Sequence, residues 1–492
     1  MFVVDLNRAD FEYDVHSIVK AFWPEEQVSV ITPQSKQEKR LELTKQVCME
    51  LFLTQEGASL KIGGKEYHWI HGKEEEEIDL RESYKDAFKR FLYKKMCEVT
   101  NKTLPWGNLT GIRPTKIAYG MLEEGKTQEE IISYLQKKHC VSEQKAILSI
   151  DIARRERELL KDIHYEGGYS LYIGIPFCPT TCLYCSFTSY PIAAYRKMVD
   201  DYVACLIREM EYVSKRYAHK ILDSVYIGGG TPTTLEANQL DRLLSSLKSL
   251  FDFNTVKEFT VEAGRADSIS REKLEVLYRH GVGRISVNPQ TMKQETLEII
   301  GRRASVKQTI EAYKLAREVG FDNINMDLIL GLPGEVEEDV QNTMNQVVEL
   351  APDSLTVHSL AIKRASKLSQ WIQQNDISTL HNTDETMRIA AEGAKQLGME
   401  PYYLYRQKNM SGNFENVGYA KPGKLGLYNI LIMEEKQTIV ALGAGSITKL
   451  VLPDGRIERC DNVKDVSLYI EKIDEMLQRK EELFALENGS SL

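Results

Sequence analysis

Three cysteines, Cys178, Cys182 and Cys185, follow an apolar run directly and stand within eight residues of one another. Thiolates this close form a soft-ligand site, which suits zinc or an iron–sulfur cluster. A structural zinc site takes a fourth ligand, usually from a second Cys/His pair. None stands near, since the closest histidines are His164 and His219. The spacing therefore favours a [4Fe–4S] cluster whose fourth iron is open to another molecule, with zinc as the alternative.

Further polar or glycine residues stand where apolar runs end. The run at 222–230 ends in Gly228, Gly229 and Gly230, and Thr231 and Pro232 follow. Three glycines let a ligand approach the backbone closely, although a triple glycine alone is more often a tight turn.

Single polar residues end other runs in the same way. Glu262 and Gln290 are hydrogen-bonding groups that could face a site or simply face solvent. Asp327 lies inside an apolar run, where a carboxylate is costly unless it is paired.

The elements that must position these residues are six apolar runs alternating with helical segments. Continuous apolar strands joined by helices predict a parallel sheet, and six units predict a partial (βα)6 barrel. Chemistry in such folds lies at the C-terminal ends of the strands, where the polar residues above fall. The six expected strands lie at 170–177, 222–230, 258–264, 283–290, 323–333 and 353–361.

The composition and the order of apolar runs and helical segments along the chain predict an α/β protein of four parts. We expect a small mixed α/β unit at 1–100, a helical connector at 101–167, the partial barrel at 168–375 and a C-terminal mixed accessory domain at 376–492. The last part includes an expected strand pair over 428–445.

The formal charge of −9 argues against a general nucleic-acid binder. No apolar run approaches the roughly 18 residues of a membrane span, and the start lacks the pattern of a secretory signal. Scattered single cysteines do not indicate a disulfide framework. We expect a cytoplasmic protein.

The C-x3-C-x2-C loop with Tyr184 before its last cysteine resembles the signature of radical S-adenosylmethionine (SAM) enzymes. The segments YIGIPF and GGGTPT resemble the oxygen-independent coproporphyrinogen III oxidase family, and CSFTSY with the long N-terminal region resembles its HemZ type. The resemblance implies a [4Fe–4S] cluster on the three cysteines and SAM as the second cofactor. It also implies that Arg302, rather than Arg303, pairs with the SAM carboxylate. The full set of SAM contacts that it implies is Tyr172, Gly228, Gly229, Gly230, Thr231, Glu262, Gln290, Arg302, Asp327, Ala361 and Ile447.

The activity implied is oxidative decarboxylation of two propionates of coproporphyrinogen III, which gives protoporphyrinogen IX. An electron donor such as flavodoxin or ferredoxin would serve it. Cations that could meet the substrate carboxylates, or be ordinary surface charges, are Lys363, Arg364, Arg406 and Lys408.

The chain departs from the oxidase pattern at Phe187, where the well-studied oxidases have a fourth cysteine. The family's haem chaperones, the HemW type, share that aromatic, but their His-Asn pair is here Tyr428-Asn429. A haem chaperone and a different radical reaction on a tetrapyrrole therefore remain as alternatives.

Overall fold

The computed structural model describes residues 1–24, 26–37, 43–73, 83–111, 113–187, 189–362, 367–375, 380–407 and 414–488. The chain divides into two compact units. The first comprises Met1–Arg155 and Leu404–Asn416, and the second comprises Glu156–Tyr403 and Val417–Leu492.

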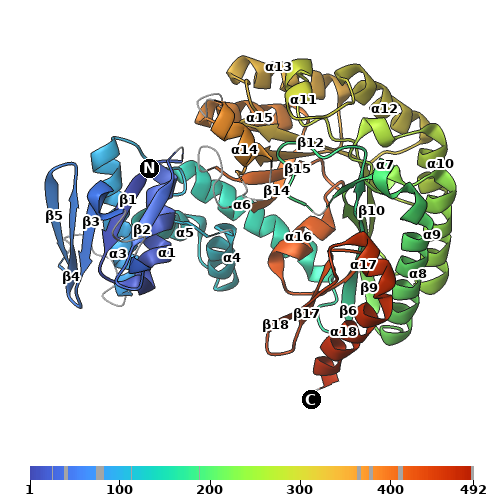
Figure 1. Cartoon of the computed structure of the whole chain (residues 1–492), viewed down its shortest axis with the longest axis horizontal. Helices are drawn as coiled ribbons and strands as arrows, with labels where there is room; N and C mark the ends of the chain where they lie inside the picture. The colour runs from blue at the N-terminus through green and yellow to red at the C-terminus, as the bar shows by residue number, and fades with distance from the viewer. Residues whose placement is uncertain are drawn as a thin grey trace. The chain divides into compact units, whose positions relative to one another are not determined.

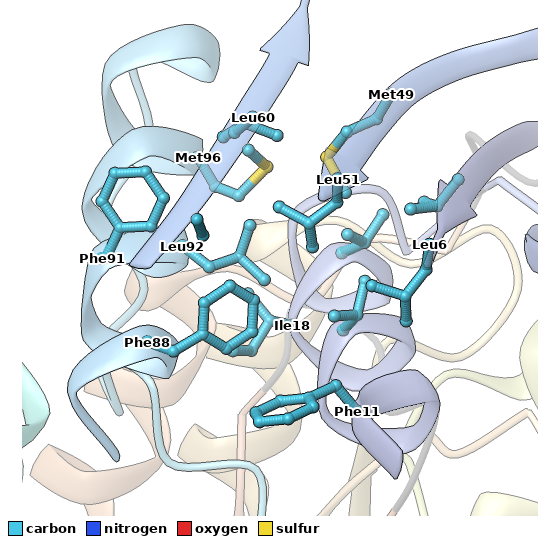
Figure 2. Close-up of a cluster of buried hydrophobic side chains, with 14 of the residues drawn as sticks. Leu6, Phe11, Ile18, Met49, Leu51, Leu60, Phe88, Phe91, Leu92 and Met96 are labelled. Carbon is cyan, nitrogen blue, oxygen red and sulfur yellow. The ribbon is translucent and has the colours of Figure 1, made fainter. Parts of the chain in front are cut away.

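The first unit contains a five-stranded sheet with the order β2-β1-β3-β4-β5. Its first three strands are parallel, and β4 and β5 complete an antiparallel meander. Strand β3 alternates buried and exposed side chains because helices cover one face of the sheet. Figure 2 shows that face, where Ile18, Phe88 and Leu92 pack against the strands. The elements are β1 (Phe2–Leu6), α1 (Glu12–Phe22), β2 (Val28–Ile31), β3 (Val47–Leu53), β4 (Gly57–Ile62), β5 (Lys65–Ile70) and α3 (Tyr84–Thr100).

Three further helices, α4 (Thr115–Glu123), α5 (Gln128–His139) and α6 (Glu143–Leu159), follow in the chain. Trp106 is fully buried beside them, and its indole Nε1 donates to the Glu415 carboxylate at 2.7 Å. This bond and the Lys145–Glu415 ion pair join the distant segment Leu404–Asn416 to the rest of the first unit.

The second unit is built on an eleven-stranded sheet with the order β14-β15-β13-β12-β11-β10-β9-β6-β16-β17-β18. Its centre holds six parallel strands in chain order, which confirms the predicted partial barrel. Helices follow these strands on the outside of the curved sheet (Figure 1). The strands are β6 (Gly168–Ile175), β9 (Ile221–Gly229), β10 (Glu258–Glu262), β11 (Arg284–Ser286), β12 (Ile324–Leu330) and β13 (Ser354–Ser359), and the helices are α8 (Val199–Arg216), α9 (Ala237–Leu250), α10 (Arg271–Arg279), α11 (Gln294–Ile299), α12 (Val306–Val319) and α13 (Glu337–Leu350).

The barrel strands alternate in polarity, although the sequence suggested continuous apolar strands. On β9, Val225 and Ile227 are buried apolar residues, whereas Ser224 donates to Ser170 on β6 and Tyr226 stacks on another tyrosine. Successive residues of a strand point to opposite faces. One face of the sheet therefore meets the helices, and the other presents polar side chains.

The C-terminal strands extend the same sheet at both edges. Strand β15 pairs antiparallel with β13, and β16 pairs parallel with β6. A buried ion pair joins Glu209 of α8 to Lys480 of α18 at 2.7 Å. The expected accessory domain over 376–492 stays a prediction, but its strands belong to the barrel sheet. The elements are α14 (Leu368–Gln374), α15 (Asp384–Gln396), β14 (Glu400–Tyr405), β15 (Asn416–Ala420), β16 (Thr438–Leu442), β17 (Ile447–Val451), β18 (Ile457–Asp461), α17 (Val466–Glu471) and α18 (Ile473–Ala485).

The expected strand pair over 428–445 is wrong in its first half, which forms helix α16 (Leu427–Glu434). A short apolar run fits a buried strand or a buried helix equally well. Tertiary contact decides here, because the Glu258 carboxylate of β10 accepts the N–H groups of Leu427 and Tyr428 at the start of the helix. Its second half is β16, as expected.

Among the described residues, the helices are all too short or too polar to cross a lipid bilayer.

Candidate functional site

The three cysteines lie on one loop at the C-terminal end of the first barrel strand. Short strand β7 (Phe177–Cys178) pairs with β8 (Tyr190–Pro191) and closes the loop at its base. The middle of the loop is anchored at Leu183, whose N–H donates to the Ile300 carbonyl and whose own carbonyl accepts the Leu368 N–H, both at 2.9 Å. Cys178 and Cys182 are buried and Cys185 is half-buried. The loop is thus fixed by the barrel around it.

Each thiol has a polar neighbour. The Cys178 Sγ lies 3.4 Å from the Thr231 hydroxyl, and the Cys185 Sγ lies 4.0 Å from the Ser189 hydroxyl. The Cys182 Sγ accepts from Arg265 Nη1 at 3.5 Å.

The pKa of the Cys178 thiol is affected by its burial and by the two other cysteines of the loop. Burial raises the pKa of the Cys178 thiol to about 11, and the nearby Cys185 and Cys182 add to that rise. In the parts of the chain that the structure describes, no three His, Cys, Asp or Glu side chains are arranged as ligands for a single metal ion.

The glycine turn after β9 lies directly against this loop. A Cβ on Gly230 would stand 2.6 Å from the Phe177 carbonyl oxygen and 3.1 Å from the Cys178 Sγ. Gly229 has a φ of +112°, which disfavours any other residue. A Cβ on Gly228 would stand 3.0 Å from the Glu262 Cδ. Side chains are therefore disfavoured along the whole turn, and its backbone borders the Cys178 thiol.

Three tyrosines stack beside the turn on the concave side of the sheet. The ring centroids of Tyr172 (β6), Tyr226 (β9) and Tyr428 (α16) form a triangle, with separations of 6.2 Å for Tyr172–Tyr226, 4.4 Å for Tyr226–Tyr428 and 6.0 Å for Tyr172–Tyr428. The Tyr226 hydroxyl donates to Glu262 at 2.5 Å. Burial raises the pKa of Glu262 to about 7, although that hydrogen bond and the Gly229 N–H oppose the rise. Glu262 therefore changes charge near neutral pH.

A second polar group forms where β11 and β12 end. The carboxylate of Asp327 accepts from Asn288 Nδ2 and Asn325 Nδ2, both at 2.7 Å. The neighbouring Gln290 is 8% exposed and has a φ of +67°, a strained value for a residue with a side chain. His358 of β13 places its Nε2 4.0 Å from the Asp327 carboxylate. These groups form a fixed hydrogen-bonding edge at the end of the barrel.

The two adjacent arginines differ in environment. Arg302 is 7% exposed, and its guanidinium donates to the Gly264 carbonyl at 2.8 Å and to the Tyr184 hydroxyl at 3.4 Å. Arg303 is exposed. Only Arg302 therefore reaches both the cysteine loop and the end of β10.

Three other residues that the sequence pointed to lie apart from these contacts. Ala361 is half-buried just beyond β13. Ile447 begins β17 and is 47% exposed, and Phe187 is 70% exposed. The hydrogen bonds described above do not reach any of them.

Sequence reasoning missed Arg265, Asn288 and His358. His358 lies in β13, Asn288 follows the end of β11 by two residues, and Arg265 follows the end of β10 by three. Side chains along a strand alternate between its two faces. Asn288 stands two residues before Gln290 in the expected strand 283–290, and His358 follows Ser354 and Thr356 at the same spacing. This alternation would have identified Asn288 and His358. Nothing in the sequence alone points Arg265 at a cysteine.

The donor set fits an iron–sulfur cluster with a small ligand beside it. Three thiols share one anchored loop, which is the ligand type such a cluster takes. The glycine turn leaves backbone without side chains next to Cys178. The Glu262 carboxylate lies against that turn, and the buried Arg302 contacts the Gly264 carbonyl just after β10. A carboxylate and a cation near the thiols can meet a ligand that carries both charges.

Comparisons with known proteins agree with this geometry. The family model described as the Radical SAM superfamily matches residues 172–347. The oxygen-independent coproporphyrinogen-III oxidase-like protein HemZ of Bacillus subtilis (strain 168) is 40% identical over 417 residues, which cover 81% of this chain and 83% of that protein. The heme chaperone HemW of the same organism is 31% identical over 278 residues, covering 56% of this chain and 70% of that protein.

A solved structure shares the fold. The coproporphyrinogen III oxidase HemN of Escherichia coli, a radical SAM enzyme, aligns with a TM-score of 0.51 and 23% identity. The alignment covers 68% of this chain and 73% of that chain.

Proposed function

Since this chain belongs to the radical SAM enzymes, as a HemZ-type member of the oxygen-independent coproporphyrinogen III oxidase family, we propose that it decarboxylates coproporphyrinogen III. Enzymes of this superfamily use a [4Fe–4S] cluster and SAM. Each of two propionate side chains would lose a β-hydrogen atom to the adenosyl radical, then carbon dioxide and one electron, which passes to a one-electron acceptor. Each would thereby become a vinyl group, giving protoporphyrinogen IX. Flavodoxin or ferredoxin would supply the electron that starts each cycle.

The observation that carries the proposal is the placement of the cysteine loop against the glycine turn. Cys178, Cys182 and Cys185 would hold the cluster, and the Gly230 backbone reaches the Cys178 sulfur with no room for a side chain. When bound, the cluster and SAM supply one-electron cleavage of a C–S bond and thereby a group that abstracts hydrogen.

The chain's own residues would bind and orient SAM around this turn. Arg302, held by the Gly264 carbonyl, would take the SAM carboxylate in its planar fork. Glu262 and Asp327 would accept hydrogen bonds, and Gln290 would donate or accept with its amide. The remaining contacts, Tyr172, Gly228, Gly229, Thr231, Ala361 and Ile447, would shape the space.

The substrate's four carboxylates require cations or hydrogen-bond donors. Lys363, Arg364 and Lys408 lie outside the described residues. Arg406 is 5% exposed and donates to the Leu109 carbonyl within the first unit. We therefore do not assign Arg406 to the substrate.

A haem chaperone is the second candidate, favoured by the similarity to HemW and by the aromatic Phe187. Tyr428 stands where that type has histidine, and it is 7% exposed within the tyrosine stack. Burial raises its pKa well above the usual value, so it is a poor source of the phenolate that would bind haem iron. This contrast supports decarboxylation over haem binding at Tyr428. Another radical reaction on a tetrapyrrole stays a third possibility.

The test is anaerobic incubation of the reconstituted protein with coproporphyrinogen III, SAM and a reductant, followed by product chromatography. We expect carbon dioxide and vinyl-bearing product in step with SAM consumption. Cys182→Ala should lose iron, sulfide and product. Cys205→Ser is the matched control, because this buried cysteine lies on α8 and its thiol donates to the Ile470 carbonyl. SAM cleavage without vinyl product, together with stoichiometric haem binding, would replace the proposal with the chaperone function.

A further inference from the structure

Arg265 is the one charged side chain that contacts a cysteine of the loop among the contacts that the structure describes. It follows β10 by three residues and is 4% exposed. Its Nη1 donates to the Cys182 Sγ at 3.5 Å, to the Thr180 carbonyl at 3.0 Å and to the Thr180 hydroxyl at 2.9 Å. A single nitrogen thus meets both the sulfur and the backbone of the loop.

The guanidinium is held in this position from its other side. Its Nε and Nη2 donate to the two carboxylate oxygens of Asp267 at 3.0 Å and 2.7 Å. Such a two-bond fork fixes the plane and direction of an arginine. The guanidinium stays protonated in proteins, so the group is a permanent, oriented cation.

We propose that Arg265 is a positioning residue that sets the reduction potential of the cluster by donating a charge-assisted hydrogen bond to Cys182. Reduction adds one negative charge to the cluster, part of which falls on its thiolate ligands. A cationic N–H donor stabilises that added charge, and hydrogen bonds to cluster sulfurs are a known determinant of potential. Arg265 therefore makes the cluster easier to reduce.

The other two thiols provide an internal comparison. The contacts described above join them to the neutral hydroxyls of Thr231 and Ser189. Hydrogen bonds from charged donors are roughly twice as strong as neutral ones. The charge-assisted bond to Cys182 should therefore shift the potential more than either of these two neutral contacts does.

The proposal uses the cluster ligands assigned under the proposed function but does not depend on decarboxylation. The test is an anaerobic redox titration of the reconstituted protein without SAM or substrate, with the reduced cluster followed by electron paramagnetic resonance. We expect Arg265→Met to lower the ratio of reduced to oxidised cluster about tenfold at a fixed potential. For one electron, that is a midpoint about 59 mV more negative. Arg265→Lys, which keeps the charge, should recover part of the shift.

Two variants separate charge from loop placement. Thr180→Val removes the hydroxyl that also donates to the Gly301 carbonyl, but it leaves the cation beside Cys182. Its midpoint should stay near that of the wild type. Arg317→Met, at an arginine that instead pairs with Asp353, should change nothing.

An unchanged midpoint in Arg265→Met, or an equal shift in Thr180→Val, would overturn the proposal. If neither Arg265 variant assembles a cluster while the wild type does, Arg265 only holds the loop and the proposal falls. If the wild type holds no iron and sulfide, the ligand assignment fails, which is a separate outcome.

Discussion

The backbone N–H of Gln290 donates to the carbonyl oxygen of Asp327 at 2.9 Å, so two residues proposed to bind SAM are tied together across neighbouring strands. The Gln290 carbonyl accepts the Ile329 N–H in return, also at 2.9 Å. This double link holds Gln290 at a φ of +67°. Strain of this kind persists only where the surrounding structure enforces it, and it gathers at functional sites.

A pair of substitutions at Gln290 separates strain from binding. Gln290→Ala keeps a Cβ at the strained φ and removes the amide, whereas Gln290→Gly removes both. We expect both variants to weaken SAM binding equally in calorimetry. Gln290→Gly should be the more stable variant, by up to about 1 kcal/mol in thermal unfolding. Unchanged SAM affinity in both would show that the amide does not touch SAM.

Gly230 tests the contact between the turn and the cysteine loop. In Gly230→Ala, the new Cβ would meet the Phe177 carbonyl at 2.6 Å, and backbone yields less readily than a side-chain tip. We expect strand β7, which carries Cys178, to be displaced, and the iron and sulfide content after reconstitution to fall. Gly283→Ala is the control, because its Cβ would find only the Phe259 oxygen, at 4.0 Å. Full cluster loading in Gly230→Ala would mean that the loop tolerates displacement.

The two arginines give a matched comparison within one segment. Arg302→Ala should weaken SAM binding by about 1.5–3 kcal/mol, the range for hydrogen bonds to charged groups. Arg303→Ala should leave the affinity unchanged, because that side chain is exposed. Calorimetry at one ionic strength measures both. A loss confined to Arg303→Ala would transfer the carboxylate contact to the exposed residue.

The sequence predicted the six barrel strands and the cysteine loop because both follow local rules, strand periodicity and ligand spacing. It did not predict helix α16, whose start depends on the distant Glu258 carboxylate. It also did not predict the contact between Arg265 and Cys182. These residues are 83 positions apart in the sequence, and only the tertiary packing brings them together. Local pattern identifies which residues can do chemistry, whereas their partners depend on tertiary contacts.

Glu262 makes the stability of the cluster-free protein depend on pH. Its pKa of about 7 in the folded chain lies above its usual value of 4.5, with burial as the main cause. Between these values the folded state holds a proton that the unfolded chain has released. The folded state thus binds more protons, so the free energy of unfolding falls as pH rises from about 4.5 to 7 and levels off above. The shift corresponds to about 3 kcal/mol at most.

Glu262→Gln mimics the protonated carboxyl and should remove the fall in the free energy of unfolding that Glu262 causes as pH rises. Calorimetric unfolding temperatures of the wild type and the variant, measured anaerobically with reduced thiols, should lie close together near pH 5 and diverge toward pH 8, with the variant higher. Glu335→Gln is the control, because burial also raises the pKa of Glu335 to about 7. That carboxylate accepts from Thr291 and is not among the proposed SAM contacts. Both variants should therefore share the pH signature, while only Glu262→Gln weakens SAM binding. A wild type and a Glu262→Gln variant that respond identically to pH would show that Glu262 is already ionised at pH 5.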